Sequence, residues 1–301
     1  MHIPVLLQEV LELMQPRADG VYVDCTFGRG GHAQAILQRL GEGGRLYAFD
    51  RDQAAADARA DLLADPRLAF THAAFSGAKP HLEQAGVYGG IDGILMDLGV
   101  SSPQLDTGER GFSFQHDGPL DMRMDQSCGE TAAEWLAAAS QSAIERCLFD
   151  YGEERHARRV ARRICEARVQ APVDTTHKLA ALVAAAVPRS GERLHPATRT
   201  FQALRIQVND ELGELTRALP LLRDGLAPAG RFCVISFHSL EDRIVKRYFR
   251  DSARPIDEFP APSRPAPFNL VTRRSVVPGD EECAANPRAR SARLRCLERA
   301  A

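Results

Sequence analysis

The sequence lacks the cysteine patterns that stabilise small secreted domains or bind structural metals. Its seven cysteines are odd in number and scattered, and no two of them follow the Cys-x-x-Cys spacing of a zinc knuckle. Neither a disulfide framework nor a zinc site is therefore indicated. We expect the cysteines to be reduced thiols.

Long apolar runs are also missing. The longest aliphatic run, residues 179–187, is about half the length that a membrane span requires. The first residues, Met1-His2-Ile3-Pro4, do not show the basic-then-apolar pattern of a secretion signal. These absences predict a cytoplasmic protein with no membrane partner.

A strong charge of either sign is absent as well. The 301 residues carry a formal net charge of -2, which argues against a surface that binds nucleic acid everywhere but leaves room for local basic patches. Almost all of the 38 basic residues are arginine. Arginine suits bidentate phosphate contacts, but the codon bias of a GC-rich genome explains the imbalance equally well.

What is present is an alternation of strand and helix patterns. Residues 21–25, 45–50, 68–72 and 91–98 read as strands separated by amphipathic segments, which predicts a parallel α/β sheet. Strand signals then disappear, and capping boxes at Thr131-x-x-Glu134 and Ser142-x-x-Glu145 indicate helices. The sheet resumes with a strand at 231–237, followed by candidate terminal strands at 269–276 and 292–297. We predict a sheet domain of residues 1–124 and 196–301 and an inserted all-helical domain of residues 125–195.

The first predicted strand leads into a glycine-rich turn and a helical run. The turn, Phe27-Gly28-Arg29-Gly30-Gly31-His32, allows the backbone to approach a nucleotide-like cofactor closely. Its glycine spacing suits a dinucleotide-dependent oxidoreductase and a methyltransferase equally. Asp24, directly before the turn, favours the methyltransferase, because a carboxylate there can meet a cationic amino-acid moiety rather than a pyrophosphate. The structural alternative for Asp24 is a helix cap or a loop hydrogen bond.

Two further carboxylates end predicted strands. Asp50 closes the second strand at the position from which a carboxylate accepts hydrogen bonds from ribose hydroxyls, and the nearby Asp52 is expected to be a helix N-cap. Asp97 ends the fourth strand before a turn rich in glycine and serine. In open α/β sheets the carboxyl edge of the strands is where ligands bind, so Asp97 is a candidate site residue. Capping a helix is its structural alternative.

Blocks of sequence that run from end to end resemble the family of ribosomal RNA small subunit methyltransferase H, formerly called MraW. They are His2-x-Pro4-Val5-Leu6-Leu7-x-Glu9, the glycine turn, Asp97-Leu98-Gly99-Val100-Ser101-Ser102, Arg110-Gly111-Phe112-Ser113-Phe114, residues 117–125, His195-Pro196-Ala197-Thr198-Arg199, residues 236–243 and residues 286–291. One departure from the family pattern is Ala33, where a serine is common.

The resemblance implies a Rossmann-like, class I S-adenosylmethionine-dependent methyltransferase with an inserted helical domain. It implies transfer of a methyl group from S-adenosylmethionine to the exocyclic N4 amine of a cytidine in the decoding region of small-subunit (16S) ribosomal RNA. The partner would be that RNA or the ribosomal subunit. The implied cofactor contacts are Gly30, Gly31, His32, Asp50, Phe75, Asp97 and Gln104. Asp24 joins this set through our interpretation of the turn.

The chemistry of an aromatic amine suggests a second role for Asp97. The lone pair of such an amine is delocalised, so a site must orient the amine and accept a hydrogen bond from it, which a carboxylate at this edge would do.

Asp117, Asp121 and Asp125 lack a tight Asp-x-Asp cluster, and we expect no metal. Ser239-x-x-Asp242 has the spacing of a capping box, which would leave His238 exposed at the sheet edge as a candidate substrate contact.

We expect the inserted domain of residues 125–195 to take part in RNA recognition, and basic residues in three segments are candidates for RNA binding. A predicted helix near residues 153–168 has an arginine face opposite an apolar stripe, although acidic neighbours make a solvated helix face the structural alternative. The segment 286–301 is rich in arginine, and the helix after residue 196 presents a polar face. The candidates are Arg155, Arg159, Arg163, Arg199, Arg205, His238, Arg288, Arg290 and Arg293. An RNA-binding factor without catalytic activity and a dinucleotide-dependent oxidoreductase remain the alternative functions.

Overall fold

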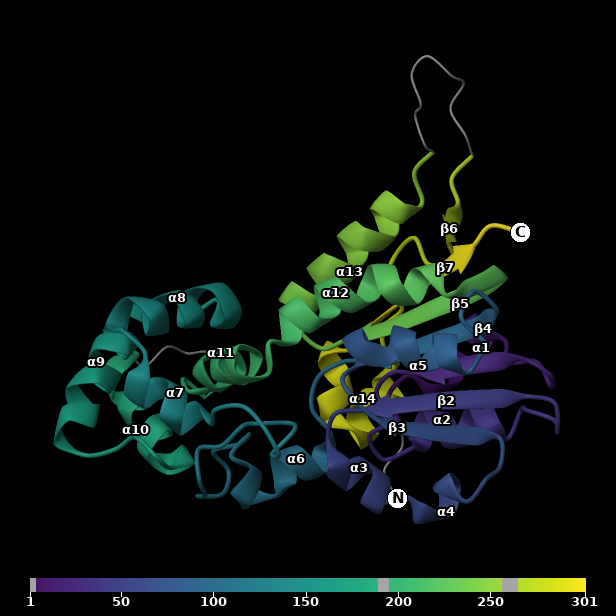
Figure 1. Ribbon diagram of the computed structural model, residues 1–301. Helices are drawn as coiled ribbons and strands as arrows, with labels where there is room; N and C mark the ends of the chain where they lie inside the picture. The colour runs from purple at the N-terminus through teal and green to yellow at the C-terminus, as the bar shows by residue number, and fades with distance from the viewer. Residues whose placement is uncertain (1–3, 189–194, 256–264) are drawn as a thin grey trace. The chain divides into compact units, whose positions relative to one another are not determined.

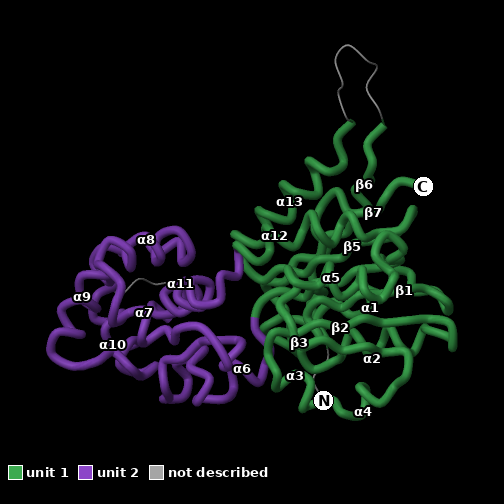
Figure 2. Tube along the Cα trace, viewed as in Figure 1, with its two compact units in different colours: residues 1–99, 213–301 green, residues 100–212 purple. Residues whose placement is uncertain are grey.

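The computed structural model describes residues 4–188, 195–255 and 265–301. Its chain forms two compact units, residues 1–99 with 213–301 (unit 1) and residues 100–212 (unit 2), which Figure 2 draws in green and purple. Among the described residues, no helix combines the length and the apolar character needed to cross a membrane. The bounds of the units differ from the predicted domains, and the RNA-recognition role of the insert stays a prediction.

Unit 1 contains a seven-stranded sheet in the order β3-β2-β1-β4-β5-β7-β6 (Figure 1). The first five strands are parallel, whereas β7 pairs antiparallel with both β5 and β6. This doubly wound order reverses beside β1, so β1 and β4 flank the switch point where ligands bind in such sheets. The predicted α/β class is confirmed. The strands are β1 (Val21–Asp24), β2 (Arg45–Asp50), β3 (Leu68–His72), β4 (Ile91–Asp97), β5 (Leu226–Ser236), β6 (Phe268–Leu270) and β7 (Arg293–Arg299).

Alternate residues of each strand point to opposite faces of the sheet, and both faces are buried in hydrophobic cores. Leu95 of β4 joins a core that includes residues of helices α1 (Leu7–Met14) and α2 (Gly31–Leu37). Its neighbours Ile94 and Met96 join a second core with α5 (Ala78–Gln84), α12 (Glu211–Asp224) and α13 (Ser239–Ser252). The remaining helical segments of unit 1 are α3 (Gln53–Asp57), α4 (Ala60–Leu63), η1 (Phe75–Gly77), α14 (Asp280–Ala285) and η3 (Pro287–Ser291).

Unit 2 is built around a separate helical core. Leu120, Met122 and Met124 of the loop before the helices are buried in that core, so the loop packs with unit 2 rather than with the sheet. The side-chain amide of Asn209 donates to the Met122 carbonyl at 2.7 Å and accepts from the Met124 amide at 2.8 Å. The helical segments are α6 (Ser102–Asp106), η2 (Gly108–Arg110), α7 (Ala132–Ala138), α8 (Gln141–Gly152), α9 (Ala157–Gln170), α10 (Thr176–Ala186) and α11 (Thr198–Asn209).

Local signals predict some helix and strand ends correctly and others wrongly. Thr131 and Glu134 form the predicted capping box of α7, and Asp52 caps α3 as predicted. The prediction of a box beginning at Ser142 is wrong, because Ser140 caps α8 by accepting from the Ala143 amide. Strand β5 begins at residue 226 rather than 231, with a register shift opposite residues 91–93 that admits the extra residues.

Candidate functional site

The glycine turn between β1 and α2 is shaped by its contacts. Gly28 and Gly30 have φ angles of 51° and 67°, in the left-handed region that favours glycine. At Gly31 a Cβ atom would lie 2.3 Å from Cγ of Pro4, so a side chain there would collide with the amino-terminal segment. The turn therefore depends on glycine for its backbone angles and for the close packing of Pro4.

Asp50 is held rigidly at the end of β2. Its Oδ2 accepts a hydrogen bond from the Gly28 amide at 2.7 Å, and its Oδ1 accepts one from the Asp52 amide at 2.8 Å. Burial raises the pKa of the Asp50 carboxyl, while these backbone amides oppose the shift. The two amides thus fix the carboxylate beside the glycine turn.

Asp24 is buried at the end of β1, with 1% of its surface exposed. Its Oδ1 accepts from the Thr26 amide at 3.1 Å, whereas its Oδ2 has no hydrogen-bond partner among the residues that the structure describes. Burial raises the pKa of this carboxyl to about 7. An enclosed acceptor oxygen without a partner is costly, which suggests a bound cation or donor as its missing partner.

Asp97 ends β4, the strand beside β1. Its backbone amide donates to Oγ1 of Thr26 at 2.7 Å, so the same residue supports both Asp24 and Asp97. Oδ1 of Asp97 has no hydrogen-bond partner in the described parts of the chain. Burial, followed by the negative charges of Asp24 and Glu241, raises the pKa of the Asp97 carboxyl to about 8. Two partnerless carboxylate oxygens therefore lie at the ends of adjacent strands.

His32 connects the glycine turn to Asp97 and to the amino-terminal segment. Its side chain is buried, with Nε2 3.0 Å from the Val5 carbonyl and Nδ1 3.7 Å from Oδ2 of Asp97. A carbonyl oxygen only accepts, so the contact with Val5 places the Nε2 proton on the ring and orients Nδ1 towards Asp97. The segment that begins at Pro4 thus holds the ring that faces the carboxylate.

The remaining predicted cofactor residues have different surroundings. Phe75 lies in η1 after β3 and is partly buried against the core shared by α5 and α12. Gln104 belongs to unit 2, where it is buried and its Oε1 accepts from the Ser101 amide at 2.9 Å in the capping box of α6. Within unit 1, the fold thus brings Asp24, His32, Asp50 and Asp97 to the turn after β1.

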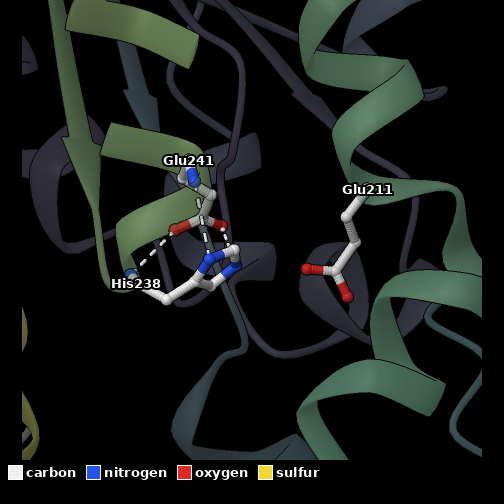
Figure 3. A group of neighbouring side chains, drawn as sticks. All are labelled: Glu211, His238 and Glu241. Atoms are coloured by element: carbon white, nitrogen blue, oxygen red, sulfur yellow. Dashed lines mark hydrogen bonds and ion pairs between the residues drawn. The ribbon is translucent and has the colours of Figure 1, made fainter. Parts of the chain in front are cut away.

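His238 is more enclosed than the sequence suggests. Its side chain is 10% exposed, and its Nε2 lies 3.2 Å from Oε1 of Glu241 (Figure 3). Residues His238 and Glu241 form the capping box of α13, so the predicted box of Ser239 and Asp242 is wrong by one residue. Oε2 of Glu241 also accepts from the Phe237 amide at 2.8 Å. His238 is therefore a cap of α13 and is not left exposed at the sheet edge.

The predicted RNA-binding residues divide into exposed and internal groups. Arg155, Arg159 and Arg163 are exposed on or beside α9, as are Arg288, Arg290 and Arg293 in the carboxyl-terminal segment. Arg205 instead makes a largely buried, two-point ion pair with Glu211, in which both N–O distances are 2.8 Å. Glu211 is the third side chain labelled in Figure 3. Asn209 on the same helix face binds the loop at 122–124. The expected polar face of α11 is thus used largely within unit 2.

Several supporting residues are not evident from the sequence. Thr26 bridges Asp24 and Asp97 through its backbone amide and its hydroxyl group. The sequence signal that could have identified this residue is its position between the strand and the turn. Arg295 has the appearance of one more basic residue of the tail, but it makes a two-point ion pair with Asp242 at 2.7 and 3.1 Å. That partner lies 53 residues away in the sequence, and no local pattern indicates it.

Comparison with known proteins assigns the family. The model of the MraW methylase family matches residues 1–300. The chain is 53% identical over 300 residues to ribosomal RNA small subunit methyltransferase H of Methylococcus capsulatus, covering 98% of this chain and all of that protein. It is 53% identical over 306 residues to the protein of the same name from Azoarcus sp., covering 99% of this chain and 96% of the relative.

A solved structure described as a putative rRNA-methylase from Clostridium thermocellum aligns over 99% of this chain and all of its own. The TM-score is 0.45 at 12% sequence identity, a likeness too weak to support an inference. The family assignment rests on the sequence matches, which confirm the predicted methyltransferase class and its cofactor, S-adenosylmethionine. The chain belongs to the MraW methylase family.

Proposed function

We propose that this chain transfers a methyl group from S-adenosylmethionine to the exocyclic N4 amine of a cytidine in the decoding region of small-subunit (16S) ribosomal RNA. The substrate class is supported by the names of relatives that are 53% identical over nearly the whole chain. The observation that carries the chemistry is the pair of partnerless carboxylate oxygens, on Asp24 and Asp97, at the ends of adjacent strands. The choice of the N4 amine rests on the sequence resemblance.

The acidic residues after β1 and β2 suit the two polar ends of the cofactor. Oδ2 of Asp24 would accept a hydrogen bond from the ammonium group of its methionine part. Asp50, oriented by two backbone amides, would accept from the ribose hydroxyls. Phe75 would lie against the adenine, and Gly30, Gly31, His32 and Gln104 would complete the contacts. These residues supply a cation partner, hydroxyl acceptors and an aromatic surface, which fits S-adenosylmethionine.

Asp97 would act on the nucleotide as well as on the cofactor. Bound S-adenosylmethionine supplies an electrophilic methyl group. A carboxylate that accepts a hydrogen bond from the N–H group of the cytosine amine would orient the nitrogen for attack. As the N–CH₃ bond forms and the S–CH₃ bond breaks, the nitrogen loses a proton, which the carboxylate would take up. The ring of His32, whose Nδ1 lies 3.7 Å from Oδ2 of Asp97, would pack beside this carboxyl group and limit its movement. Asp97 is the only residue to which we assign proton transfer.

Exposed arginines would hold the RNA. A base that leaves its stack costs a few kcal/mol, which contacts to the phosphate backbone offset. Six arginines are exposed and would make those contacts, namely Arg155, Arg159 and Arg163 in unit 2 and Arg288, Arg290 and Arg293 in unit 1. Arg199 and His238, which are less exposed, are secondary candidates, and Arg205 would act through its ion pair with Glu211.

The function is tested by single-turnover transfer of a labelled methyl group to small-subunit RNA and to assembled subunits, followed by mapping of the modified nucleotide. Label on the N4 atom of one decoding-region cytidine is the expected result. Tight binding of the RNA without any transfer would instead support an assembly factor that has kept the fold but not the activity. Transfer to a different atom or RNA would also contradict the proposal.

Replacement of Asp50 by alanine tests the cofactor site. We expect S-adenosylhomocysteine, which cannot react, to bind about 10- to 150-fold more weakly, the equivalent of roughly 1.5 to 3 kcal/mol for hydrogen bonds to a charged acceptor. Calorimetric titration measures this change. Asp52→Ala is the matched control, because it removes a carboxylate that caps α3 and should cost about 1 kcal/mol of stability with little effect on affinity. Equal affinities of wild type and a folded Asp50→Ala protein would refute the assignment.

A further inference from the structure

Unit 1 contains a pair of adjacent arginines on a loop that is fixed at both ends. The loop follows β6, and the amides of Val271 and Thr272 donate to the Cys296 carbonyl at 3.1 and 3.3 Å. Oγ1 of Thr272 accepts from the Cys296 amide at 2.8 Å. Four residues later, Val276 and Leu294 form an antiparallel bridge with two 2.9 Å hydrogen bonds. The intervening residues Arg273 and Arg274 are exposed, so β7 holds them in a defined place.

A second basic segment meets this loop. Arg290 lies in η3 and Arg293 is the first residue of β7, and both are exposed. Nη1 of Arg293 is 3.5 Å from Oγ of Ser275, the residue after Arg274. Because Arg293 pairs with Ser236 at the end of β5, the two segments meet at the carboxyl edge of that strand. Ligands of open α/β sheets bind at this edge.

The fold neutralises two arginines of the neighbouring strands β5 and β7 but not these four. Arg231 pairs with Glu298 at 2.8 Å, and Arg295 pairs with Asp242. In the described parts of the chain, Arg273, Arg274, Arg290 and Arg293 have no carboxylate within ion-pair distance. Residues 271–293 contain five arginines against three carboxylates, one of which, Glu282, accepts from the Leu6 amide at 2.8 Å. Gathering like charges does not stabilise the fold, so a function for them is indicated.

We propose that Arg273, Arg274, Arg290 and Arg293 form one phosphate-binding surface, the edge arginine surface, which binds the backbone of the substrate RNA next to the target nucleotide. This inference rests on the proposed function and adds Arg273 and Arg274 to its RNA contacts. Guanidinium groups bind phosphates through paired N–H donors, and a loop that is fixed before binding loses little entropy. The surface lies at the carboxyl edge of β5, so it would hold the strand that enters or leaves the site.

The test compares two double variants in the full-length protein. Arg273→Ala with Arg274→Ala removes the loop pair. Lys246→Ala with Arg247→Ala removes another exposed, adjacent basic pair, on α13, and is the matched control. Affinity for a small-subunit RNA fragment that spans the decoding region is measured between 50 and 200 mM salt. Loss of two phosphate contacts should reduce the slope of log K against log salt by about 1.4 to 1.8, since each contact contributes about 0.7 to 0.9. The control should keep the wild-type slope.

Three further measurements distinguish phosphate binding by these side chains from a purely structural role of the loop. Arg273→Lys with Arg274→Lys should keep most of the salt slope, because lysine retains the charge. Binding of S-adenosylhomocysteine should be unchanged in every variant. If wild type methylates the RNA while the alanine pair keeps the wild-type slope, the edge arginine surface is refuted and the proposed function stands. If wild type fails to bind or methylate that RNA, the proposed function itself is refuted. A lower affinity with an unchanged slope would show a structural role for the loop and overturn the inference.

Discussion

Replacing Asp97 by asparagine is expected to reduce kcat by about 10²- to 10⁴-fold, the usual contribution of a positioned general base. The substitution keeps the shape of the side chain and the hydrogen bond from the backbone amide to Thr26, so the end of β4 should stay in place. It removes the negative charge that would accept the amine proton. Single-turnover rates with saturating cofactor and RNA measure the effect on the chemical step.

The affinity for S-adenosylhomocysteine decides between the two roles of Asp97. If the residue acts on the amine, Asp97→Asn should lower kcat far more than it weakens binding of this unreactive product. If the two quantities fall by similar factors, Asp97 is only a cofactor contact, and the proposed role in proton transfer is wrong. Asp52→Asn is the control, because asparagine caps helices as well as aspartate does and rates should be unchanged.

The pH dependence gives an independent readout of the same carboxyl. Because the pKa of Asp97 is raised to about 8, the carboxyl of the free enzyme is mostly protonated at neutral pH and cannot accept a proton. The value of kcat/KM for the RNA, measured with saturating cofactor, should therefore rise with pH up to about 8 and then level off. Asp97→Asn should lose this dependence. Asp24 interacts with Asp97, so the observed midpoint belongs to the pair rather than to either residue alone.

The positions of the three site carboxylates could be predicted from the sequence because they follow from strand geometry. Parallel strands end at the same edge, so Asp24, Asp50 and Asp97 had to lie near one another once their strands were recognised. Their hydrogen bonds could not be predicted. The oxygen of Asp24 that lacks a partner and the bridging role of Thr26 depend on distances that no residue pattern specifies.

The wrong prediction of a capping box at Ser239 and the unpredicted ion pair of Arg205 share a physical cause, namely partners that are distant or compete locally. Both Ser239-x-x-Asp242 and His238-x-x-Glu241 have the spacing of a capping box, and Arg295 holds Asp242 in an ion pair instead. In an uninterrupted helix, Arg205 would lie on the polar face. The chain instead turns at Asp210, where φ is 48°, and Glu211 reaches Arg205. Periodicity describes a continuous helix and does not register such a break.

Asp24→Asn is expected to change stability and cofactor binding in opposite directions. The pKa of the buried carboxyl is raised to about 7, so between about pH 4 and 7 the folded protein holds a proton that the unfolded chain has lost. The free energy of unfolding therefore falls as pH rises through this range, and the penalty is fully present above pH 7. Asparagine carries no charge and keeps an acceptor for the Thr26 amide, so at pH 8 the variant without cofactor should be more stable than wild type by a few kcal/mol and melt several degrees higher.

The same substitution should weaken S-adenosylhomocysteine binding by about 10- to 150-fold at pH 8, because the carboxylate that meets the ammonium group is lost. In wild type this affinity should improve as pH rises through about 7, and in the variant it should not. Asp92→Asn is the matched control. Its carboxylate accepts from the Val21 amide at 2.8 Å and pairs with Arg17, so that variant should melt lower and bind the cofactor normally. An Asp24→Asn protein that loses both stability and affinity would show that the carboxylate serves the fold, whereas a gain in stability with a loss of affinity identifies a charge that the fold keeps buried for its ligand.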